Sequence, residues 1–119
     1  MLENSTSQLQ LIDKNFVDLI WENQPKTQYT DIFDHPTSFA GQARSEKLDI
    51  LKKFLDQNEI DHYFVSGLDN IAWLLNLRAD DIKYTPLLYS YLLISKNNKH
   101  SLYINAVSYT HLRAHETLL

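Results

Sequence analysis

The stretch Gly67 to Arg78, which reads GLDNIAWLLNLR, decides the fold class of this chain. Its apolar side chains recur at helical spacing, and Asp69 near its start is the expected N-cap. The residues expected to face the core are Ile71, Ala72, Leu74 and Leu75. The stretch therefore predicts a short helix, followed by a polar loop from Leu77 to Pro86.

Strand patterns lie on both sides of this helix. Residues 62–66 have strand composition and end at a glycine, and residues 87–95 are apolar nearly throughout, as in a strand buried on both faces. Residues 96–99 supply turn-forming side chains, and residues 100–105 return as a further strand. Together these elements predict an α/β fold in which helices flank a mixed sheet.

Two more helices are expected upstream. Residues 42–57 repeat leucines at three- and four-residue spacing, which predicts an amphipathic helix with lysines on its solvent-facing side. The lysines assigned to that side are Lys47, Lys52 and Lys53. Asn15 is a possible N-cap for a helix over residues 16–21, and residues 22–38, which contain two prolines, are typical of a linker.

Composition excludes several classes of function. The chain has 119 residues, a formal net charge of -4, two glycines and no cysteine. Two glycines are too few for a loop that wraps phosphate groups, and without cysteine there is neither a disulfide framework nor a thiolate metal site. The acidic balance predicts no nucleic-acid or membrane partner, and no apolar run approaches the roughly 20 residues that span a bilayer.

Three blocks of sequence resemble one family when they are taken together. They are residues 15–21 (NFVDLIW), residues 39–41 with 46–48 (FAG and EKL), and residues 67–78, continued by Asp81, Tyr84 and Pro86. Their order and spacing are similar to those of the three-domain aminopeptidase P, or Xaa-Pro aminopeptidase, family. The third block is long and specific, whereas the first two would be weak evidence alone.

The resemblance implies where the chain belongs in a larger enzyme. Residues 1–32 are expected to be the end of a preceding domain and a linker, and residues 33–105 the first part of a second, creatinase N-terminal-like α/β domain. The family's catalytic domain, with a dinuclear manganese centre, is expected downstream, and no position here matches its ligand motifs. The parent enzyme is expected to be cytoplasmic and homodimeric, and its catalytic domain is the expected partner of this chain.

The sequence departs from the family pattern in two places. Relatives usually have glycine after the arginine of the Asn-Leu-Arg motif, where Ala79 stands here. Residues 106–119 do not continue the family pattern and resemble translated sequencing-adapter sequence, so we expect them to be a tail foreign to the family. His111, His115 and Glu116 in this tail have helical spacing for a shared metal, but no third ligand is evident.

The candidate site residues lie in the loop that follows the central helix. Arg78, Asp81 and Tyr84 are expected to border a substrate entrance or to contact another domain, since a guanidinium can grip a carboxylate through two hydrogen bonds. The local alternative is that Arg78 pairs with a neighbouring aspartate or with the helix end. Asp80 and Asp81, with Asp69, could be pictured as a cation site, but a solvated loop is the expectation.

The sequence therefore predicts a chain with no catalytic or metal-binding residues of its own. Its expected role is that of a non-catalytic N-terminal part of an Xaa-Pro aminopeptidase, which removes an N-terminal residue preceding proline. There it would shape access to the active site and support dimer contacts. The alternatives are a stand-alone α/β interaction module that binds through residues 77–86, and, ranked last, a small zinc hydrolase using His111 and His115.

Overall fold

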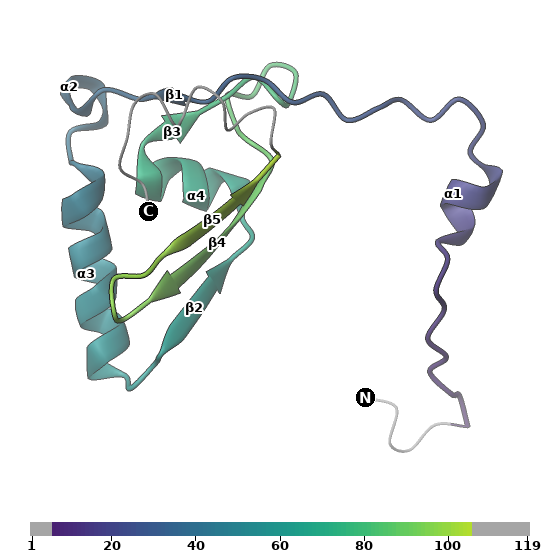
Figure 1. Cartoon of the computed structure of the whole chain (residues 1–119), viewed down its shortest axis with the longest axis horizontal. Coiled ribbons are helices and arrows are strands. Elements are labelled where there is room, and N and C mark those ends of the chain that lie inside the picture. Colours follow the sequence, from purple (N-terminus) through teal and green to yellow (C-terminus); the bar gives the residue numbers. More distant parts are fainter. Residues whose placement is uncertain (1–5, 106–119) are drawn as a thin grey trace.

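The computed structural model describes residues 6–105, which form a small α/β domain preceded by an extended arm (Figure 1). The helices are α1 (Phe16–Ile20), α2 (Thr37–Ala40), α3 (Arg44–Gln57) and α4 (Leu68–Leu75). The strands are β1 (Phe33–Asp34), β2 (His62–Val65), β3 (Leu77–Arg78), β4 (Ser90–Ser95) and β5 (Ser101–Ile104). The expected α/β class is confirmed.

The main sheet has three strands in the order β2-β4-β5, and both pairings are antiparallel. In the register, Val65 of β2 lies opposite Leu92 of β4, and Leu92 lies opposite Leu102 of β5. No parallel pair of strands occurs within residues 6–105. The reason is that α4, β3 and the following loop return the chain to the end where β2 finished, so β4 runs back along it.

A second, two-stranded sheet replaces the first part of the expected polar loop. Phe33 of β1 pairs antiparallel with Arg78 of β3, and Asp34 pairs with Leu77. Leu77 is fully buried, so the loop does not begin there but after this short strand. The expectation was wrong because the partner strand comes from residues 33–34, whose composition indicated a linker.

Helix α4 begins two residues earlier than an N-cap at Asp69 would place it. Gly67 is the N-cap, and Asp69 lies in the first turn, where its Oδ1 accepts a hydrogen bond from the backbone N–H of Asn70 at 2.9 Å. A Cβ atom at position 67 would lie 2.7 Å from the side-chain nitrogen of Asn70. The close atom is the end of an exposed side chain, and Asp69 is not the cap of this helix.

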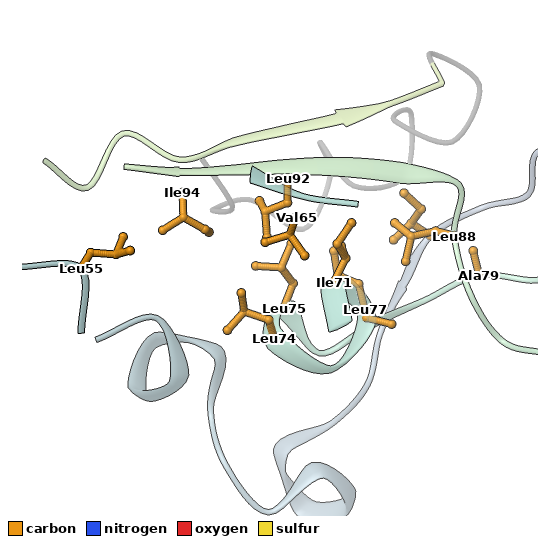
Figure 2. Close-up of a cluster of buried hydrophobic side chains, with 12 residues drawn as sticks. Leu55, Val65, Ile71, Leu74, Leu75, Leu77, Ala79, Leu88, Leu92 and Ile94 are labelled. Carbon is orange, nitrogen blue, oxygen red and sulfur yellow. The ribbon is translucent and has the colours of Figure 1, made fainter. Parts of the chain in front are cut away.

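The core lies between the three-stranded sheet and the helices α3 and α4 (Figure 2). Leu92 and Ile94 of β4 point from the sheet toward Leu74 and Leu75 of α4, and Leu55 closes the cluster from α3. All five side chains are buried, and the four expected core residues of α4 are among the buried set. The helical spacing of the sequence therefore identified the correct face of α4.

The opposite face of the sheet is exposed in the described part of the chain. Phe64 and Tyr91 stack there with ring centroids 5.7 Å apart, and Tyr103 is the register partner of Tyr91. All three aromatic rings are exposed. The strand expected to be buried on both faces is therefore buried on one, because within residues 6–105 the helices pack on a single side.

The N-terminal arm extends away from the domain and carries α1 (Figure 1). Asn15 caps α1 as expected, since its Oδ1 accepts a hydrogen bond from the backbone N–H of Val17 at 2.9 Å. None of the residues of α1 is buried. None of the helices within residues 6–105 is long and apolar enough to cross a membrane.

The hairpin between β4 and β5 is closed by polar contacts at its turn. The Nδ1 atom of His100 accepts a hydrogen bond from the backbone N–H of Ser95 at 3.2 Å, which requires this nitrogen to be unprotonated. Burial, and to a smaller extent the charge of Lys52, holds the pKa of His100 below its usual value. An exposed ion pair between Lys96 and Asp61 joins the same turn to the start of β2.

The core assignment predicts unequal effects for two identical truncations on β4. Leu92→Ala removes a fully buried side chain facing α4 and should lower the free energy of unfolding by about 2–5 kcal/mol. Leu93→Ala, on the partly exposed opposite face, should cost clearly less. Urea denaturation monitored by circular dichroism checks both, and equal costs would contradict the one-sided core.

Candidate functional site

Arg78 is the last residue of β3, and its guanidinium is directed back to α4. Its Nη1 donates hydrogen bonds to the backbone oxygens of Ala72, at 2.6 Å, and of Leu77, at 2.8 Å. The last carbonyl groups of a helix lack partners within the helix and carry partial negative charge. The Ala72 oxygen already accepts from the backbone N–H of Asn76, so Arg78 adds a second hydrogen bond near the end of α4, and its role at an entrance or a domain contact stays a prediction.

Asp81 is buried, with 8% of its surface exposed. Its Oδ1 accepts hydrogen bonds from the backbone N–H of Thr30 at 2.6 Å and from the Thr30 hydroxyl at 3.0 Å. Its Oδ2 accepts from the backbone N–H of Tyr89 at 2.8 Å. The expectation of a solvated loop is therefore wrong for Asp81, because donors from two distant segments converge on its carboxylate, and it holds for the exposed Asp80.

Tyr84 stands at the outer tip of the loop, with 93% of its surface exposed. Its backbone has φ 65°, and its neighbours Ile82 and Thr85 form an isolated antiparallel bridge across it. The Lys83 ammonium lies 5.1 Å from the centre of its ring. The three predicted site residues thus occupy three environments: Arg78 at a helix end, Asp81 inside the domain, and Tyr84 in solvent.

Lys47 is a buried residue that the sequence analysis placed on the solvent-facing side of its helix. It is 3% exposed, and its Nζ donates hydrogen bonds to the backbone oxygen of Trp73 and to Oδ1 of Asn76, both at 2.7 Å. The ammonium also lies 4.3 Å from the centre of the Trp73 ring. Burial first, and the charge of Arg78 second, hold the pKa of Lys47 below its usual value.

The spacing of residues on α3 contains the signal that identifies Lys47. It precedes Leu51 and Leu55 by four and eight residues, so all three share one helical face. A prediction that places every charged residue in solvent misses the burial of Lys47. The lysine stem lies along the apolar face, and its ammonium reaches oxygen atoms at the end of α4.

Among the hollows on the described part of the chain, two adjoin the core of the domain. A pocket of about 740 Å³ is lined from three segments, which are the linker before β1, the start of α4, and the ends of β4 and β5. Its lining includes four tyrosines: Tyr29, Tyr89, Tyr91 and Tyr103. A second, more apolar groove of about 450 Å³ lies over Lys47, between α3, α4 and β2. Neither hollow contains Arg78, Asp81 or Tyr84 in its lining.

Within the described residues, no group of three or more histidine and carboxylate side chains is placed to hold a metal ion. Asp69, Asp80 and Asp81 accordingly do not form the cation site considered from the sequence. His111, His115 and Glu116 lie outside the described residues.

The fold and the sequence block that forms α4 define the class of protein. The creatinase/prolidase N-terminal domain model matches residues 23–118. The chain therefore belongs to the creatinase/prolidase N-terminal domain family. The matched range begins upstream of β1 and includes residues 106–118, and the domain boundaries expected at residues 32 and 105 stay predictions.

Named relatives make the assignment more specific. A probable Xaa-Pro aminopeptidase P of Talaromyces marneffei is 41% identical over 105 residues, which are 87% of this chain and 16% of that protein. The corresponding protein of Sordaria macrospora is 38% identical over 100 residues, which are 83% of this chain and 16% of that protein. The chain thus matches the Xaa-Pro aminopeptidase family over a short part of the relatives' length.

A solved structure has the same fold. The X-prolyl aminopeptidase of Caenorhabditis elegans, a cytosolic enzyme with a di-nuclear active site, superposes with a TM-score of 0.79 at 31% identity. The superposition covers 86% of this chain and 17% of that enzyme. The resemblance carried by three short blocks of sequence is therefore confirmed, as is the family assignment of the domain.

The contacts of Lys47 predict a stability effect for its replacement. Lys47→Met keeps an unbranched apolar stem but removes the charged donor of two hydrogen bonds, so the free energy of unfolding should fall by about 1.5–3 kcal/mol. Lys53→Met, on the exposed side of α3, is the matched control and should change the free energy of unfolding little. Urea denaturation measures both, and equal unfolding midpoints would contradict a structural role for Lys47.

Proposed function

We propose that this chain is a non-catalytic N-terminal part of a metal-dependent Xaa-Pro aminopeptidase. The observation that carries the proposal is the TM-score of 0.79 to the nematode enzyme, obtained over 86% of this chain but only 17% of that enzyme. A domain of this size accounts for a small share of such a protein. The parent would remove an N-terminal residue preceding proline, using ligands that lie outside the described residues.

Within that parent, we propose that the loop after β3 borders the active-site entrance or a contact with another domain. Arg78 and Asp81 hold the loop from inside, through the end of α4 and through Thr30 and Tyr89. Tyr84 is the member of the three that is exposed enough to touch another surface. The loop is thus exposed at its tip and held in place at its base. A loop that is already ordered loses less conformational entropy when it binds another surface.

The remaining properties of the parent belong to the same proposal. The nematode enzyme is cytosolic with a di-nuclear active site, which supports a cytoplasmic parent with two metal ions. Manganese is the metal we propose, and a homodimer is the proposed assembly. A di-nuclear centre, when bound, supplies an activated water for hydrolysis. The residues described here would act only by shaping the approach to that centre.

The rival proposal is a stand-alone interaction module that uses the same exposed loop. Tyr84 serves that proposal equally well, since tyrosines are common anchors of protein contacts. The two proposals differ in the coding sequence expected downstream of this chain. A reading frame that continues into a metallopeptidase domain supports the aminopeptidase, and a frame that ends shortly after residue 105 supports the module.

The first functional prediction concerns the chain by itself. Purified, it should not hydrolyse Xaa-Pro peptides with or without added manganese, because no converging metal ligands lie within residues 6–105. Release of the N-terminal residue from a fluorogenic Xaa-Pro peptide is the measurement. Turnover that survives repurification and disappears with a chelator would contradict the proposal.

The second functional prediction concerns Tyr84 in the full-length parent. Tyr84→Asn removes the ring while retaining a residue that tolerates the positive φ of this position, so the loop should keep its shape. We expect kcat/KM for an Xaa-Pro peptide to fall several-fold, with an unchanged melting temperature. Tyr84→Phe keeps the ring and should behave like the parent. A Tyr84→Asn enzyme with unaltered kcat/KM would remove this residue from the entrance.

A further inference from the structure

The linker before β1 is attached to the domain along a defined path. Thr30 lies 51 residues from Asp81 in sequence, yet its backbone N–H and its hydroxyl both donate to the same carboxylate oxygen. Ile32, two residues on, is buried in the core, and β1 then pairs with β3. Residues 30–34 are therefore held against the domain, although their composition is that of a linker.

The Thr30 hydroxyl also accepts a hydrogen bond from the backbone N–H of Asp80 at 2.7 Å. The hydroxyl therefore accepts one hydrogen bond, from the Asp80 backbone, and donates another to the Asp81 carboxylate. Asp81 in turn accepts from the backbone N–H of Tyr89, which leads into β4. The result is one connected network that joins the linker, the loop after β3 and the start of the central strand.

The geometry of this network requires a carboxylate. Three N–H or O–H groups converge on the two oxygens of Asp81, and an ionised carboxylate is the one side chain of this size that only accepts. Asparagine has the same shape but presents an NH₂ group in place of one oxygen. That group would face either the Tyr89 N–H or the two Thr30 donors, leaving a buried donor unsatisfied.

The residues beside this network form a wall of the larger pocket. Tyr29, adjacent to Thr30, meets Tyr89 edge to face with ring centroids 6.2 Å apart. Both line the 740 Å³ pocket, together with Thr27 from the linker. The facing wall comes from the sheet, with Tyr91 and Tyr103. The linker thus supplies part of the pocket lining, through Thr27 and Tyr29.

We propose that Asp81 is a positioning residue that fastens the linker to the domain and thereby builds the tyrosine-lined pocket. The inference goes beyond the proposed function and does not rest on it, because it concerns contacts within this chain. Its consequence is that the segment upstream of the linker leaves the domain in a fixed direction. Asp81 sets that direction through Thr30, from inside the domain.

The test compares Asp81→Asn with Asp80→Asn in the 119-residue chain. The two variants make the same chemical change at adjacent positions, one buried in the network and one exposed. The measurement is amide hydrogen exchange by NMR. The exchange rates of the Thr30 and Tyr89 amides report on the network, and those of Leu92 and Ile94 report on the core. For Asp81→Asn we expect exchange at Thr30 or Tyr89 to accelerate roughly tenfold or more relative to the core amides, because one donor loses its acceptor.

A second pair of variants protects the test against simple misfolding. Thr30→Val removes the hydroxyl at nearly constant shape and should loosen residues 27–32, measured as faster proteolytic cleavage there, while Thr30→Ser should restore the slow cleavage. Core exchange should stay within about twofold in both variants. Uniform acceleration across the core, equal effects of Asp80→Asn and Asp81→Asn, or unchanged exchange at Thr30 and Tyr89 would each overturn the proposal.

Discussion

The arrangement of the domain depends on the hydrogen bonds made by Asn76. This residue ends α4 in the left-handed conformation, with φ 52°. Its side-chain oxygen accepts from Lys47 at 2.7 Å, and its side-chain nitrogen donates to the backbone oxygen of Gln42 at 2.8 Å. Its backbone oxygen accepts from the backbone N–H of His35 at 2.7 Å. One residue therefore connects the end of α4, the start of α3 and the segment after β1.

This junction explains why a lysine is buried in so small a domain. The ammonium of Lys47 is removed from water, yet it donates to two oxygens and lies over the Trp73 ring. A buried charge with such partners restricts the relative placement of the helices more sharply than an apolar contact of equal size, because hydrogen bonds are directional. Arg78 completes the arrangement by donating to the Ala72 backbone oxygen near the end of α4.

The same construction relates the domain to its place in a larger enzyme. The two buried charged side chains, Lys47 and Asp81, bond to backbone groups of segments far away in sequence, and no cluster of metal-binding side chains accompanies them within residues 6–105. Both contacts hold segments that are distant in sequence against one another. The exposed features of the domain include the Tyr84 loop and the aromatic face of the sheet around Phe64 and Tyr91, which are surfaces suited to contact.

Local patterns were sufficient to predict the α/β class, the family and the inward face of α4, because helical spacing and one long motif are properties of neighbouring residues. The cap of α1 at Asn15 was predictable for the same reason, since it bonds a residue two positions away. The environments of Lys47, Leu77 and Asp81 depended instead on tertiary contacts. Lys47 bonds to Trp73, 26 residues away, Asp81 bonds to Thr30, 51 residues away, and Leu77 pairs with a strand of only two residues. Contacts between distant segments leave no periodic pattern in the sequence. Residue type and local composition therefore predicted that these three side chains lie in solvent or in a loop, whereas the folded chain buries them.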